Sequence, residues 1–134
     1  MDLATLQQRA RAARQVAHTI EHPMGAIVWR MLVPTQHEVL LASHRTQALA
    51  GGADRSGLLV LQRAVLEAAI VGWEGARVGH VLPADAEAQA PLPWEMGAVP
   101  VLLDALPDQA QELADVLNQH MAKRTQALEA DAKN

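Results

Sequence analysis

One stretch decides how the chain is read: Ile70-Val71-Gly72-Trp73-Glu74-Gly75-Ala76-Arg77. Apolar side chains at helical spacing lead into this stretch, and we expect them to share one helix face: Leu58, Leu61, Val65, Ala69 and Trp73. This central helix should begin after a cap at Asp54 or Ser56 and end near residue 73. The polar, Gly- and Pro-containing residues that follow predict a long loop over residues 74–94, a length that is usually functional or disordered in a compact domain.

Just upstream, a second helix is predicted to begin at residue 35. Thr35 and Glu38 have the spacing of a capping box, in which each side chain accepts a hydrogen bond from the other residue's backbone N–H. Gly51-Gly52 should end this helix near residue 50.

The N-terminal segment, residues 2–20, repeats small and apolar side chains three and four positions apart. This spacing predicts a one-sided helix that Pro23 and Gly25 terminate. The run at residues 26–33 is short and rich in β-branched residues. It fits an extended segment or a buried turn of helix, and its periodicity does not separate the two.

Downstream of the loop, helical character is expected to return near Glu95, with breaks at Pro100 and Pro107. Asp108 is a candidate N-cap for a last helix, which should fray from about residue 127 to residue 134 because its apolar stripe thins there. Residues 78–82 have the composition of a short strand.

Composition favours helices over sheets. Of the 134 residues, 26 are Ala, while Phe and Tyr are absent and Trp occurs only three times. Ala has the highest helix propensity, and small side chains let helices approach closely. We therefore predict a mainly α fold: one helical domain over residues 1–134, with four to five helices, one long loop and room for one short strand or hairpin.

Charge and apolar runs argue against several classes of partner. The net charge is −4, with +2 over residues 1–30 and −6 over the remainder, so nucleic acid is not an expected ligand. No apolar run approaches the roughly 20 residues of a membrane span, and the N-terminus lacks the layout of a signal peptide. With no Cys present, a cytoplasmic location is expected.

The chain offers few candidates for catalysis or metal binding. His18-Thr19-Ile20-Glu21-His22 matches the inverted zinc-protease pattern, and on a helix the two His residues would lie one turn apart. Pro23 follows at once, however, so the second His would sit at a helix end. Because no other chemistry-bearing constellation stands out, we expect no enzyme activity, no cofactor and no metal.

Two of the Trp residues have different surroundings in sequence. Trp73 follows an apolar helix and is predicted to be core. Trp94 lies between Pro93 and Glu95 in a polar segment, where it either contacts a partner or pins the loop onto the helices. The predicted partner-binding residues are those at the two ends of the loop: Trp94, Pro93, Glu95, Glu74 and Arg77.

The order of these parts resembles the small tail assembly chaperones of long-tailed bacteriophages and prophages, of siphovirus or Mu-like type. The resemblance covers residues 28–122. It rests on Met31-x-x-Pro34-Thr35-x-x-Glu38, on Val71-Gly72-Trp73-Glu74-Gly75, on Pro91-x-Pro93-Trp94, and on an acidic C-terminal helix. The chain departs from the family in lacking an Asp-Gly-rich loop insert, in having Trp94 where Phe is commoner, and in Pro100.

The resemblance implies a protein that acts in the host cytoplasm during tail assembly and is not part of the mature virion. Its partners would be the tape-measure protein and the tail-tube protein. The family is also known for forms extended by a −1 frameshift, and the final Lys133-Asn134 pair is compatible with a slippery A-AAA-AAC heptamer. The alternative is a small helical dimerising or regulatory module without a phage role, in which the stripe from Leu3 to Ile20 would be a homodimer seam.

Overall fold

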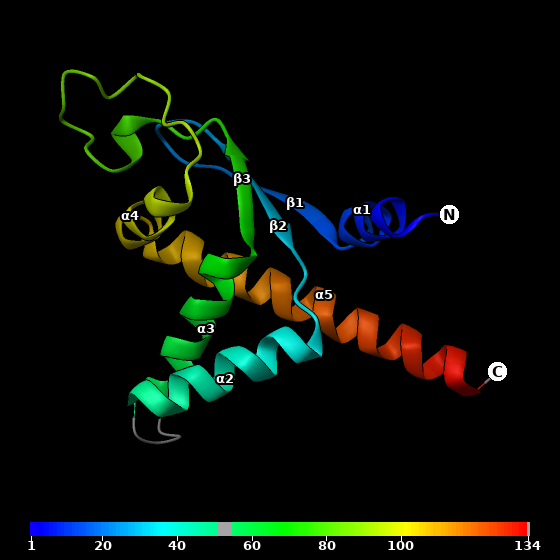
Figure 1. Ribbon diagram of the computed structural model, residues 1–134. Helices are drawn as coiled ribbons and strands as arrows, with labels where there is room; N and C mark the ends of the chain where they lie inside the picture. The colour runs from blue at the N-terminus through cyan, green and yellow to red at the C-terminus, as the bar shows by residue number, and fades with distance from the viewer. Residues whose placement is uncertain (51–54, 134) are drawn as a thin grey trace.

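The computed structural model describes residues 1–50 and 55–133 of the chain (Figure 1). The elements follow one another as α1 (Leu3–Ala13), β1 (Gln15–Ile20), β2 (Ile27–Leu32), α2 (Gln36–Ala50), α3 (Arg55–Ala69), β3 (Ile70–Glu74), the 3-10 turns η1 (Val78–His80) and η2 (Met96–Ala98), α4 (Val99–Ala105) and α5 (Pro107–Lys133). The three strands form one antiparallel sheet in the order β1-β2-β3. The mainly α prediction is therefore wrong: the fold is mixed, with helices packed on a small sheet.

The N-terminal segment is a helix followed by a strand, whereas one helix over residues 2–20 was predicted. Its helix begins with Asp2, whose carboxylate accepts from the Thr5 N–H at 2.7 Å, but it ends at Ala13, and β1 follows directly. In β1 the side chains alternate between exposed and half-buried, with Val16 and Ile20 turned toward the core. Side chains four positions apart lie on one face of a helix and also on one face of a strand. The stripe of Ala and β-branched residues was therefore compatible with a helix and with a strand.

The ambiguous run at residues 26–33 is the central strand β2. It pairs with β1 along its whole length, from Gln15 opposite Leu32 to Ile20 opposite Ile27. On its other side it pairs with β3, with Trp29 opposite Trp73 and an irregularity between Arg30 and Met31. Its side chains alternate between buried and half-buried, as a strand with a helix on one face requires.

The stretch at residues 70–77 begins with a strand, β3, and not with the last turn of a helix. The central helix ends at Ala69, and Ile70–Glu74 continues as a strand rather than as the last turn of that helix. Ile70 and Val71 are β-branched and Gly72 disfavours helix, so the local preference agrees once β2 supplies a hydrogen-bonding partner. Trp73 is nevertheless core, as predicted, with 8% of its surface exposed.

The core lies between the sheet and α5, which crosses beneath it (Figure 1). Trp29 is fully buried at its centre, packs edge-on against Trp73 at 5.8 Å between ring centroids, and donates its indole N–H to Gln109 of α5 at 3.2 Å. The surrounding apolar side chains come from β2, α4 and α5: Ile27, Met31, Leu102, Leu103, Leu113 and Leu117. This packing holds the sheet, α4 and α5 in one body.

The capping box predicted for the second helix is confirmed. The Glu38 N–H donates to Thr35 Oγ1 at 3.2 Å, and the Thr35 N–H donates to Glu38 Oε2 at 3.0 Å, which is the expected capping box at the start of α2. The Gly51-Gly52 stop and the Asp54 cap lie outside the described residues, as does Asn134 of the expected slippery codon pair. Residues 75–95 form a long connection, interrupted by η1 where a short strand was expected.

The C-terminal elements differ from expectation at the two prolines. Pro100 lies in the first turn of α4, where the missing N–H has no helical partner to lose, and so it does not break the helix. α5 begins at Pro107 itself, which places Asp108 in its first turn and not at the N-cap. α5 is helical through Lys133, and the fraying expected from residue 127 stays a prediction. Within residues 1–50 and 55–133, no helix has the length and apolar character needed to cross a bilayer.

Candidate functional site

Three of the five predicted partner-binding residues meet at one hollow beside the sheet. Arg77, Pro93 and Trp94 line a hollow of about 430 Å³, whose floor includes Trp73 and Leu92. Trp94 remains 36% exposed, whereas Trp73 beneath it is buried. The hollow thus combines an accessible indole ring, a guanidinium group and proline rings, which suits contact with a protein surface.

Backbone hydrogen bonds fix the two arms of the loop that build this hollow. The Leu92 N–H donates to the Ala76 carbonyl at 2.8 Å, and the Trp73 indole N–H donates to the Leu92 carbonyl at 2.8 Å. Gly75 turns the chain with φ +83°, and a Cβ at this position would lie 2.5 Å from the Ala26 carbonyl oxygen. The Gly in Trp-Glu-Gly is therefore required by the close approach of the β1–β2 hairpin.

The structure does not bring the two acidic candidates into this hollow. Glu74 ends β3 and accepts from Arg30 at 2.7 Å across the sheet. Glu95 is exposed and precedes η2. Neither side chain lines the hollow, so only Trp94, Pro93 and Arg77 of the predicted set act together in space.

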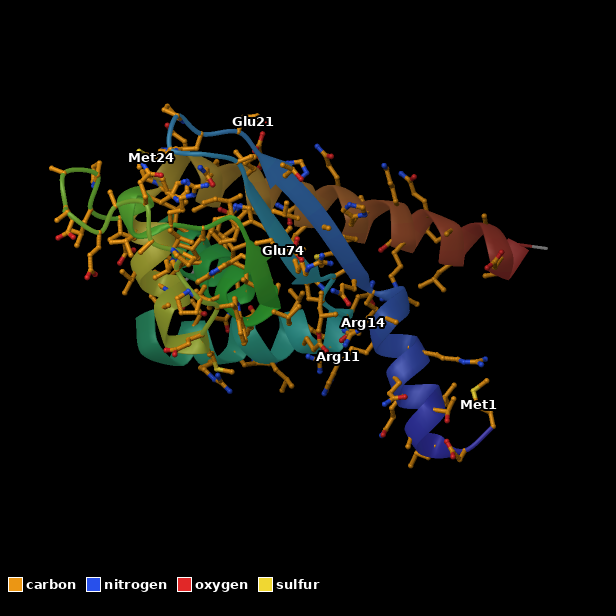
Figure 2. The ribbon with its side chains drawn as sticks, turned by 90° about the horizontal axis from the view of Figure 1, so that it is seen from above. Met1, Arg11, Arg14, Glu21, Met24 and Glu74 are labelled. Atoms are coloured by element: carbon orange, nitrogen blue, oxygen red, sulfur yellow. The ribbon has the colours of Figure 1, made fainter. Side chains whose placement is uncertain are left out.

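Trp94 also borders a second hollow of about 540 Å³, on the side that faces the base of α1. Arg11, Arg14 and Glu38 lie along it, and Met96 adjoins Trp94. Figure 2 shows Arg11 and Arg14 where α1 joins the sheet, while the rest of α1 points away from the body of the protein. Trp94 thus lines both hollows.

Glu38 is the best-connected carboxylate of this second hollow. Arg14 donates to both of its oxygens, at 3.0 and 3.1 Å, and the Thr35 N–H donates to one of them. Partial burial acts to raise the pKa of Glu38, but the Thr35 hydrogen bond and the positive charges of Arg14 and Arg124 outweigh it, so the pKa lies below its usual value. The Glu38 carboxylate therefore stays ionised and has a structural role, since it holds Arg14 and the start of α2.

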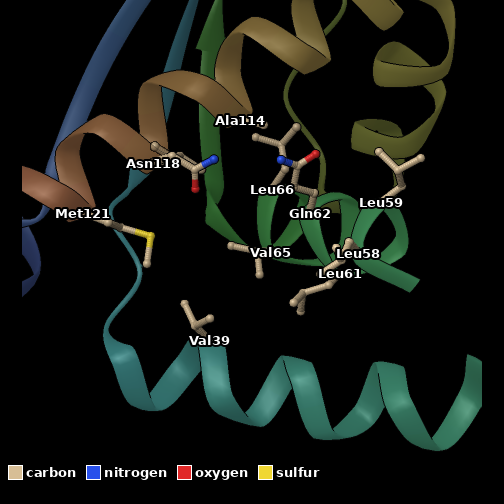
Figure 3. Close-up of a pocket in the computed structure, with 11 residues that line it drawn as sticks. Val39, Leu58, Leu59, Leu61, Gln62, Val65, Leu66, Ala114, Asn118 and Met121 are labelled. Atoms are coloured by element: carbon tan, nitrogen blue, oxygen red, sulfur yellow. The ribbon is translucent and has the colours of Figure 1, made fainter. Parts of the chain in front are cut away.

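A groove with no charged lining residue was missed at the sequence level. A groove of about 400 Å³ lies between α2, α3 and α5, and Figure 3 shows Val39 of α2 facing Val65 of α3 and Met121 of α5 across it. None of its eleven lining residues is charged. Leu58 and Leu59 at its edge are 62% and 57% exposed, although Leu58 was expected on the core face of its helix.

The signal for this groove is present in the sequence but is not decisive there. α3 carries apolar side chains over more than one face, at Leu58, Leu59, Val60, Leu61 and Val65. Such a helix is usually buried on several sides. Only the positions of α2 and α5 show that one of these sides is left open.

The histidines do not form the metal pair that the sequence allowed. His18 lies on β1 with Nε2 3.6 Å from a Glu112 oxygen, while His22 lies in the following turn with its ring 4.8 Å from that of His80. Burial and the neighbouring His80 lower the pKa of His22. Among the described residues, no three His, Asp or Glu side chains are grouped in a way that would hold a metal ion.

His80 has a structural position. It is buried, its Nδ1 accepts from the Arg77 N–H at 2.9 Å, and its Nε2 lies 2.9 Å from the Gly25 carbonyl. Because Nδ1 accepts, the proton resides on Nε2, which donates to Gly25. His80 thereby ties the start of the long loop to the turn between β1 and β2.

Comparison with known proteins adds no family: no protein-family model, no curated protein and no solved structure matches the chain.

Proposed function

We propose that this protein is a non-enzymatic assembly chaperone of the bacteriophage tail type, acting in the host cytoplasm and absent from the mature virion. Its partners would be the tape-measure protein, through exposed apolar helices, and the tail-tube protein. The single observation that carries this proposal is the uncharged apolar groove between α2, α3 and α5, with Leu58 and Leu59 exposed at its edge. Exposed contiguous apolar surface of this kind usually marks a protein-interaction site.

The motif order gives the proposal its direction. The capping box of α2, the Gly-Trp-Glu-Gly segment, the Pro-x-Pro-Trp step and the acidic α5 all belong to the described structure, and two of them build the hollow at Trp94. A protein that covers apolar surface on an assembling partner lowers the concentration of the aggregation-prone form by mass action. This is the physical basis of the chaperone role.

Co-expression tests the proposal. The gene should lie beside genes for a tail-tube protein and for a long helical tape-measure protein. The tape-measure protein, expressed with this protein, should move from the pellet into the soluble fraction, and a tagged copy should capture it. A tape-measure protein whose solubility and recovery are the same with and without this chain would refute the chaperone role.

The alternative, a homo-oligomerising module without a phage role, is supported by a separate observation. None of the α1 residues is buried, and Leu3 is 68% exposed. If α1 is a dimer seam, deletion of residues 1–12 should convert a dimer into a monomer in light scattering while barely changing the melting temperature, because α1 contributes no core side chain. A protein that is monomeric with and without α1 would remove this alternative.

A further inference from the structure

The turn between β1 and β2 is closed by a titratable side chain. The Gly25 N–H donates to the His22 carbonyl at 2.9 Å, and the Met24 N–H donates to Nδ1 of the His22 ring at 3.1 Å. Because Nδ1 accepts this hydrogen bond, the ring is neutral and carries its proton on Nε2. The His22 ring therefore closes the turn only in its neutral form.

This turn holds the start of the long loop at two points. The Gly25 carbonyl lies 2.9 Å from Nε2 of the buried His80, which donates to it. The Met24 side chain packs so closely on Gly79 that a Cβ at that glycine would overlap its terminal methyl group. Figure 2 shows Met24 beside this part of the loop. A change in the shape of the turn would therefore remove both contacts.

The start of the loop is in turn connected to the hollow at Trp94. His80 accepts from the Arg77 N–H at 2.9 Å, and Arg77 lines that hollow. Arg77 also forms an isolated antiparallel bridge with Pro91 of the returning arm. The contacts of His80 thus fix the position of the guanidinium group that borders the exposed indole ring.

The surroundings of His22 disfavour a positive charge. Its ring centroid lies 4.8 Å from that of His80. Among the described residues, no carboxylate oxygen lies within 4.0 Å of a nitrogen of either ring, although one does for His18. Burial and the neighbouring His80 accordingly lower the pKa of His22. The other titratable groups on the turn and the loop are Glu21, Arg77, Asp85 and Glu87.

We propose that His22 is the proton sensor of a latch: uptake of a proton at its Nδ1 opens the turn at residues 22–25 and releases the start of the long loop, together with Arg77 of the candidate site. The proton enters at Nδ1 because Nε2 already carries one, and the new N–H then faces the Met24 N–H, donor to donor. The turn loses the bond that closes it, and the Gly25 carbonyl is no longer held against His80.

The direction of the pH dependence follows from the neutral ring in the closed turn. The closed form binds a proton less readily than the open form, so the latch is closed above about pH 6.5 and weakens as the pH falls below that value. The inference does not rest on the proposed function, since it concerns the shape of the site and not the partner that the site binds.

A pH titration of the ¹⁵N-labelled wild-type protein by NMR tests the latch, from about pH 7.5 to about pH 5. Imidazole ¹⁵N shifts report the protonation of His22, and backbone order parameters report the mobility of the loop. As His22 gains its proton, the order parameters of residues 76–82 should fall from about 0.85 to below about 0.6, while those of residues 109–117 in α5 stay unchanged.

Two results of this titration would overturn the inference. One is a loop that stays rigid while His22 becomes protonated. The other is a loss of order in residues 109–117 together with the loop, because acid would then unfold the whole chain and not open one turn.

His22→Asn removes the titratable group and keeps an acceptor, since an Asn side chain accepts from the N–H two residues later in an Asx turn. This variant should keep the loop ordered over the whole pH range. His44→Asn, at an exposed position on α2, is the matched control and should release the loop as the wild-type protein does. Release of the loop at the same pH in His22→Asn and in the wild-type protein would contradict the assignment.

His80→Asn tests the other side of the latch. The shorter side chain no longer reaches the Gly25 carbonyl, so residues 76–82 should be mobile already at about pH 7.5, where His22 is neutral. A loop in this variant that is as ordered as in the wild-type protein would show that the contact between His80 and Gly25 does not hold the loop, and the latch would be refuted.

Discussion

At the scale of single residues, Trp73 and Trp94 lie on the same hollow but in opposite environments. Trp73 is packed edge-on against Trp29 and donates its indole N–H to the Leu92 carbonyl, whereas Trp94 keeps 36% of its surface exposed. A buried large side chain contributes to stability in proportion to the apolar surface and packing it supplies. An exposed one contributes mainly when a partner covers it.

We therefore expect Trp73→Ala to lower the free energy of unfolding by about 3–5 kcal/mol in urea denaturation. Trp94→Ala should barely change that free energy and should weaken capture of the tape-measure or tail-tube protein by about 2 kcal/mol. The two variants serve as controls for each other. An unfolded Trp94→Ala protein, or one that captures its partners as well as wild type, would make Trp94 a structural residue.

At the scale of elements, the junction between β3 and the β1–β2 hairpin depends on one position. Gly75 has φ +83° and passes so close to Ala26 that a Cβ would lie 2.5 Å from the Ala26 carbonyl oxygen. β3 is an edge strand, since the sheet has the order β1-β2-β3. A shift at this junction would displace both β3 and the loop that carries Trp94.

Gly75→Ala should accordingly destabilise the protein by about 1–3 kcal/mol, because the new Cβ is strained at positive φ and collides with backbone. Gly97→Ala is the matched control: its added Cβ meets nothing within 4 Å, and the change in free energy of unfolding should stay within about 0.5 kcal/mol. Thermal denaturation of both variants measures these changes in stability. Equal stability of Gly75→Ala and wild type would show that the hairpin and β3 are not held together at this turn.

At the scale of the whole molecule, two groups make stability depend on pH in the same direction. Burial and the nearby His80 lower the pKa of His22, so the unfolded chain binds a proton more readily as the pH falls through the ordinary value of 6.5. Glu38 has a lowered pKa as well, since the Thr35 and Arg14 contacts outweigh its burial. Its contribution is present above the ordinary value of 4.5 and is lost as the pH falls further.

Urea unfolding should therefore show a decline in stability as the pH falls below about 6.5, followed by a second decline as it falls below about 4.5. His22→Gln should remove the first decline, while His44→Gln, at an exposed position on α2, should retain it. Glu38→Gln should reduce the second. A first decline of the same size in His22→Gln and in the wild-type protein would contradict the assignment to His22.

The sequence by itself determined the parts of this protein whose interactions are local. The capping box of α2 joins residues three positions apart, and α5 repeats its apolar side chains over many turns, so both helices follow from spacing alone. The burial of Trp73 and the long connection after it also agreed with expectation. Trp94, Pro93 and Arg77 line one hollow, but their role in binding a partner stays a prediction.

Only the tertiary structure decided the parts that depend on partners far away in the chain. Residues 15–20 and 70–74 became strands because β2 lies between them and pairs with both, and no local pattern records that pairing. The apolar groove between α2, α3 and α5 exists because α2 and α5 leave one side of α3 uncovered, which depends on how three helices are placed. Local preferences are short-range, whereas strand pairing and open surfaces are set by the packing of the whole chain.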